Sequence, residues 1–99
     1  MEIMKTNNNI ANFVPAFAIH PGEYISDELA AQDISQSNLA KLIGIEKSQL
    51  NEIIKGKRGI NAEVALLLQA ALGIDADFWV NAQKNYELDL AKINDAIKE

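Results

Sequence analysis

Cysteine is absent from this chain of 99 residues. Its absence excludes disulfide frameworks, cysteine nucleophiles and thiolate metal sites, and nothing in the composition indicates an oxidising compartment. No apolar run approaches the roughly 20 residues that span a bilayer. The N-terminus also lacks the basic-then-apolar layout of a signal peptide, because Lys5 is followed by polar residues 6–9. We therefore expect a cytoplasmic protein with no membrane partner.

Histidine occurs once, and this scarcity limits any catalytic interpretation. His20 precedes Glu23 and Asp27, but no nucleophile or second histidine accompanies it. Beside Pro21 and Gly22 it is more simply a residue at the entry of a helix. The chain is expected not to be an enzyme, and no metal or cofactor is predicted.

The net charge of −5 is unevenly distributed. Residues 35–61 contain five basic and two acidic residues, a local charge of +3, whereas the rest of the chain carries −8. The basic residues of this segment are Lys41, Lys47, Lys55, Lys57 and Arg58. A basic face on an acidic body indicates two kinds of partner, one anionic and one cationic.

The hydrophobic content of 48% in a chain this short is enough for one core. Residues 1–18 are predicted to be an arm, flexible or docked, because the asparagine tract cannot bury apolar area. Residues 19–99 are predicted to be a single domain. Helix caps and apolar spacing predict five helices and no strand: residues 21–32, 36–43, from 46 or 47 to 55, 62–72 and 76–97.

Residues 36–55 have the pattern of a helix-turn-helix, in which two short helices cross steeply. Ala40 provides a small residue at the crossing, and Gly44 provides a glycine in the turn. The positions expected to face the core are apolar: Leu39, Ile43, Ile45, Leu50 and Ile53. A plain helical hairpin would need the same packing but not the polar outer face of the second helix, so the pattern favours DNA binding.

Candidate DNA-binding residues divide by role. The second helix of the motif would enter the major groove with Lys47, Ser48, Gln49 and Asn51; the two amides suit adenine and the lysine suits guanine. Phosphate contacts are expected from residues at the edges of the motif: Gln36, Lys55, Lys57 and Arg58.

Several segments resemble the HigA antitoxins of the XRE helix-turn-helix superfamily. They are residues 20–23 (HPGE), the motif itself, residues 51–60 (NEIIKGKRGI), residues 71–73 (ALG), residues 78–83 (FWVNAQ) and residues 86–88 (YEL). The resemblance covers residues 20 to about 92. It implies an all-α, five-helix, λ-repressor-like domain with an extended C-terminal helix. It also implies a protein that neutralises a small basic ribonuclease toxin and binds its own operator as a dimer.

The chain departs from that family at two places. Glu46 stands where serine or threonine usually caps the recognition helix, which places a carboxylate near DNA phosphates. Leu67 and Ala70 stand where basic residues are common in the next helix. That helix is apolar almost all round, so we expect it to be buried or to form an interface.

Two surfaces are candidates for protein partners. An apolar stripe on the last helix extends beyond any plausible monomer core, and its later members are expected at a homodimer interface: Tyr86, Leu90, Ile93 and Ile97. Glu23, Asp27 and Glu28 lie on one side of the first helix. They are either a solvated face or a docking strip for a basic toxin.

Three functions remain open from the sequence. The favoured one is an antitoxin that also represses its own operon. The second is a solitary XRE-family repressor with no toxin. The third is a protein-interaction module that has lost DNA binding.

Overall fold

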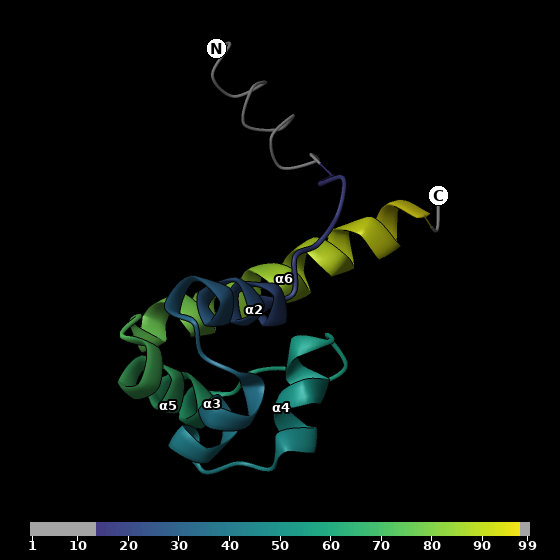
Figure 1. The fold of residues 1–99 in the computed structure, drawn as a ribbon. Helices are drawn as coiled ribbons and strands as arrows, with labels where there is room; N and C mark the ends of the chain where they lie inside the picture. The colour runs from purple at the N-terminus through teal and green to yellow at the C-terminus, as the bar shows by residue number, and fades with distance from the viewer. Residues whose placement is uncertain (1–13, 98–99) are drawn as a thin grey trace.

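The computed structural model describes residues 14–97, which contain five helices and no strand (Figure 1). The helices are α2 (Pro21–Gln32), α3 (Gln36–Ile43), α4 (Lys47–Ile54), α5 (Ala62–Leu72) and α6 (Ala76–Ile97). The predicted all-α architecture is confirmed, and the helix bounds agree except that α4 ends one residue early, with Lys55 as its C-cap. The predicted arm lies largely in residues 1–13, outside the described residues; its remainder, residues 14–18, has no helix.

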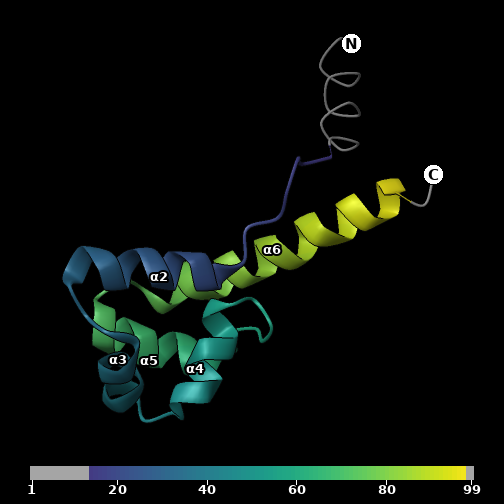
Figure 2. The same ribbon diagram turned by 45° about the vertical axis from the view of Figure 1, so that its right-hand side comes forward.

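The helices form two layers around one core. In both ribbon views α2 and α6 lie side by side and form one layer. The helices α3, α4 and α5 form the second layer, drawn below them (Figures 1 and 2). The largest fully buried side chains come from every helix and include Ile25, Leu39, Leu50, Leu68 and Trp79. Burying each such side chain stabilises the fold by roughly 1.5–3 kcal/mol before entropy is counted.

Side-chain caps fix where the helices begin. Ser35 accepts from the amide of Asn38 at 3.1 Å, and Asn61 accepts from the amide of Val64 at 2.8 Å. At the start of α6, the amide of Ala76 donates to the Gln69 side chain at 2.7 Å. Because the first amides of a helix lack intrahelical partners, these bonds determine the register of each helix.

Gly22 lets α2 cross α4 at close range. A Cβ at this position would overlap the carbonyl oxygen of Ile53 and lie 2.8 Å from that of Ile54. Only glycine fits such an approach of backbone to backbone. The crossing attaches the end of α4 to α2.

The apolar helix α5 is buried on one side only. Val64, Ala65, Leu68 and Leu72 are in the core, whereas Leu66 is 59% exposed. The C-terminal part of α6 extends beyond the other helices (Figure 2). No helix within residues 14–97 is long and apolar enough to cross a membrane.

Candidate nucleic-acid interface

The two helices α3 and α4 pack as the sequence pattern predicts. Leu39, Ala40 and Leu50 are buried between them and the core. Gly44 has φ of 74°, a left-handed conformation that favours glycine, and its amide donates to the carbonyl of Ala40 at 2.9 Å. The turn therefore redirects the chain from α3 into α4, which packs against α3, as in a helix-turn-helix.

The outer face of α4 is polar. Lys47 and Ser48 are exposed, and Gln49 is half-buried. Glu46 is the N-cap residue, but its side chain makes no capping hydrogen bond. Its carboxylate is thus not committed to the helix and lies beside the residues predicted to contact DNA.

Asn51 and Gln36 form a pair that links the two helices of the motif. The Asn51 amide nitrogen donates to Gln36 Oε1 at 3.3 Å, and both side chains are half-buried. The sequence assigned them separate roles, one to bases and the other to phosphate. In the free protein each orients the other, so the two residues act as one polar unit.

The loop that follows α4 presents three cations, Lys55, Lys57 and Arg58, all exposed. Arg58 donates from Nε and from a terminal guanidinium nitrogen to Glu52 Oε1 at 3.0 and 2.8 Å. Both side chains of this ion pair are about half exposed, and such pairs contribute only about 0–1 kcal/mol. The pairing positions Arg58 beside α4 and partly offsets its charge.

Gln83 of α6 holds that loop in place. Its side-chain oxygen accepts from the amide of Ile60 at 2.8 Å, and its nitrogen donates to Glu87 at the same distance. The amide group also lies close to Gly59, where a Cβ would be 3.0 Å from the Gln83 nitrogen. Sequence reasoning missed this residue, because nothing in local spacing connects positions 60 and 83.

His20 lies where α2, the loop after α4 and α6 meet. Its Nδ1 accepts from the amide of Gly22 at 2.9 Å and so caps α2. Its ring lies against Gly56 and makes an edge contact with Tyr86, with 4.8 Å between ring centroids. Burial lowers the pKa of His20 below its ordinary value of 6.5, although a hydrogen bond with the backbone of Arg58 and the charge of Glu23 act in the opposite direction. The prediction that His20 is a helix-entry residue is confirmed.

The residues predicted at protein interfaces lie on the other layer of the molecule. On α6, Leu90 is 38% and Ile97 is 75% exposed, whereas Tyr86 and Ile93 are half-buried. On α2, Glu23 and Asp27 are exposed, and Glu28 accepts from Gln32 at 2.8 Å. The acidic and apolar candidates thus belong to α2 and α6, and the basic candidates to α4 and its loop.

Residues 25–79 match the helix-turn-helix family HTH_3. Virulence-associated protein I of Dichelobacter nodosus is 42% identical over 76 residues, which are 76% of this chain and 70% of that protein. Among solved structures, the HigA-family addiction module antidote protein of Coxiella burnetii is 35% identical, with a TM-score of 0.78 over 83% of this chain and 90% of that one. The Pseudomonas aeruginosa antitoxin HigA, solved with the higBA promoter, is 35% identical, with a TM-score of 0.75 over 82% and 89% of the two chains.

Proposed function

We propose that this chain, which belongs to the HTH_3 helix-turn-helix family, is an antitoxin that represses its own operon. The observation that carries the DNA-binding half is the surface of α4. It combines exposed and half-buried hydrogen-bonding side chains with the neighbouring exposed cations Lys55, Lys57 and Arg58. Such a surface suits the major groove and the phosphates beside it. The related antitoxin solved with its promoter DNA supports the same assignment.

We assign roles to individual side chains as part of this proposal, and their placement supports the assignment. Lys47, Ser48, Gln49 and Asn51 read base edges, and the Gln36 side chain, paired with Asn51, contacts phosphate at the start of α3. Lys55, Lys57 and Arg58 bind phosphates without reading sequence. Arg58 exchanges its pairing with Glu52 for a phosphate when DNA binds.

The test of this half uses DNA from upstream of the chain's own coding sequence. Fluorescence anisotropy compares that duplex with a scrambled duplex of the same composition at equal salt. We expect the upstream duplex to bind at least about a thousandfold more tightly, as specific sites typically do. Equal affinity for the two duplexes would contradict sequence-specific repression.

The antitoxin half rests on the fold and on charge. Outside residues 35–61 the chain carries −8, and the solved HigA-family proteins share its fold. An acidic body suits a small basic toxin of the ribonuclease class, because opposite charges speed encounter. Co-expression with the product of the adjacent reading frame tests this: a basic protein should copurify and its toxicity should be suppressed.

The second candidate is a solitary repressor. It shares the α4 surface and the operator, but it gives the acidic helices no partner. Absence of any toxic or copurifying neighbour, together with tight binding to the upstream duplex, would favour it over the antitoxin.

A further inference from the structure

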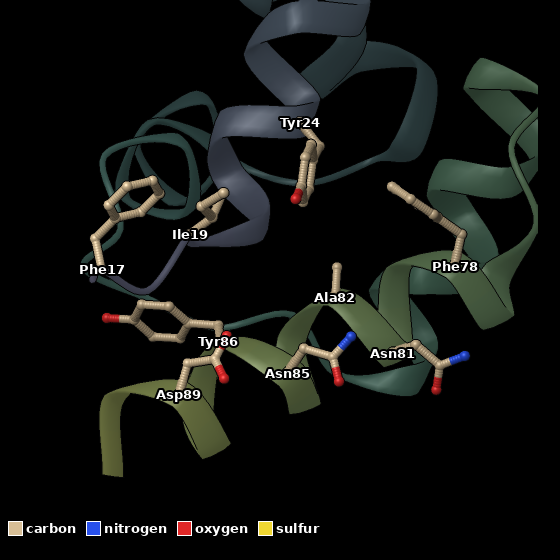
Figure 3. A pocket seen from close by; sticks show the side chains of 9 residues that line it. All are labelled: Phe17, Ile19, Tyr24, Phe78, Asn81, Ala82, Asn85, Tyr86 and Asp89. Carbon is tan, nitrogen blue, oxygen red and sulfur yellow. The ribbon is translucent and has the colours of Figure 1, made fainter. Parts of the chain in front are cut away.

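A cavity of about 270 Å³ lies between α2, residues 78–89 of α6 and the segment that precedes α2 (Figure 3). Ala82 is at its floor, where α6 approaches α2. Four aromatic side chains from these three elements line it: Phe17, Tyr24, Phe78 and Tyr86. The cavity is large enough for one long side chain and too small for a helix or strand.

The aromatic walls are held by neighbouring rings. Tyr24 makes an edge contact with Phe78 at 5.5 Å, and Phe78 makes another with the fully buried Trp79 at 5.1 Å. On the opposite wall, Tyr86 contacts the buried His20. Such edge contacts are favourable, so Tyr24, Phe78 and Tyr86 are positioned by neighbouring rings, whereas Phe17 is 67% exposed.

The polar part of the cavity comes from one side of α6. Asn81, Asn85 and Asp89 recur every four residues and line it together. Among the described residues 14–97, Asp89 is the one charged residue in the lining, and no lysine, arginine or histidine of this range is part of it. The two helices that frame the cavity carry seven carboxylates against two lysines, a net charge of −5. The potential at this site therefore favours a cation.

We propose that this cavity receives an arginine side chain projected from a basic protein partner. The planar guanidinium stacks flat on aromatic rings and pairs with a carboxylate through two N–H groups at once, whereas an ammonium is a point charge and a neutral side chain carries no charge. Asp89 accepts two of its N–H groups, and the oxygens of Asn81 and Asn85 accept others. This assignment rests on the proposed function, because it locates the anchor point of the basic toxin on the acidic layer of the molecule.

The chemistry of the cavity is testable without the toxin. ¹⁵N-labelled protein is titrated with N-acetylarginine amide, and N-acetylcitrulline amide serves as the neutral isostere. We expect saturable shifts of the Asn81 and Asn85 side-chain amides with arginine only. Asp89→Asn should raise the dissociation constant at least about fivefold, as loss of a charge-assisted pair does, whereas the matched control Asp95→Asn, also on α6 but outside the lining, should leave it unchanged. Equal shifts with citrulline, or no saturable shift with arginine, would overturn the assignment.

The source of the arginine is tested with the copurified basic protein. Asp89→Asn should weaken that complex at least about tenfold and Asp95→Asn should not. Unchanged affinity of the Asp89 variant would overturn the docking site while leaving the antitoxin function intact. If no basic protein binds, the proposed antitoxin function fails, and the arginine titration still decides whether the cavity selects cations. Shifts of the cavity residues that depend on protein concentration alone would instead assign the cavity to a second copy of the chain.

Discussion

Gly22 has no room for a side chain, because a Cβ would overlap the Ile53 carbonyl of α4. Gly22→Ala must push α2 away from α4, so we expect a loss of about 3 kcal/mol or more in the free energy of unfolding. Gly44→Ala is the matched control: its Cβ would meet nothing within 4 Å, so only the strain of a left-handed alanine remains, about 1–2 kcal/mol. Urea denaturation of both variants measures the difference. Equal losses would show that the helix crossing relaxes freely.

His20 makes stability depend on pH. Burial lowers its folded pKa, so between the unfolded pKa near 6.5 and the lower folded value the unfolded chain binds more protons. The contribution of His20 to the free energy of unfolding is therefore fully present above pH 6.5 and is lost as the pH falls through this window. Protonation of Nδ1 also removes the acceptor for the amide of Gly22.

The variant His20→Asn separates this effect from the titration of carboxylates. Asparagine caps a helix well but does not titrate near neutral pH. We expect the free energy of unfolding of the variant to fall less between pH 7 and 5 than that of the parent, whatever its absolute stability. Identical slopes for the two proteins would remove His20 as a source of the pH dependence.

The helices themselves were predictable because their boundaries are encoded locally. Ser35 and Asn61 each cap within three residues of their own position, and Gly44 and Gly73 end their helices in the left-handed conformation. Glu46, a glutamate at the N-cap position of α4, makes no side-chain capping hydrogen bond. Boundaries of this kind depend on neighbours in the chain, which a single sequence displays.

The contacts that shape the site were not predictable in the same way. The Gln36 to Asn51 bond spans 15 residues and the Ile60 to Gln83 bond spans 23, and both depend on how the helices pack. The sequence indicated which residues are polar and near α4. It carried no signal that Glu52 would pair with Arg58 or that Gln83 of α6 would support the loop after α4. A glutamate or a glutamine suits the outer face of a helix equally well with or without such a partner.

Gln83 tests whether α6 supports the loop. Gln83→Ala leaves the buried amide of Ile60 without its acceptor, which costs about 1–3 kcal/mol and should loosen residues 56–60. Hydrogen exchange of the Ile60 amide should accelerate, and affinity for all DNA should fall as Lys57 and Arg58 lose their fixed position. Lys84→Ala, an exposed neighbour on the same helix, is the control. Unchanged protection of Ile60 would show that the loop is held by other contacts.

The uncovered end of α6 is proposed to form the dimer that sets operator geometry. Leu90→Glu with Ile93→Glu places carboxylates in the interface, so we expect monomers that remain helical and bind the operator weakly. Leu88→Glu is the control, because Leu88 is exposed but lies outside the predicted stripe. Sedimentation and circular dichroism measure the two properties. A folded dimer of the double variant that still binds tightly would place the interface elsewhere, with exposed Leu66 of α5 the next position to change.

Titration of variants against operator and scrambled duplexes at two salt concentrations tests whether α4 reads DNA sequence. Asn51→Ala should cost about 1–3 kcal/mol on the operator and little on scrambled DNA. Lys57→Ala with Arg58→Ala should weaken both duplexes alike and reduce the salt slope by about two, while the control Lys84→Ala changes neither. Equal losses on both duplexes for the Asn51 variant would contradict base reading by α4, and full affinity of the double variant would contradict phosphate binding by Lys57 and Arg58.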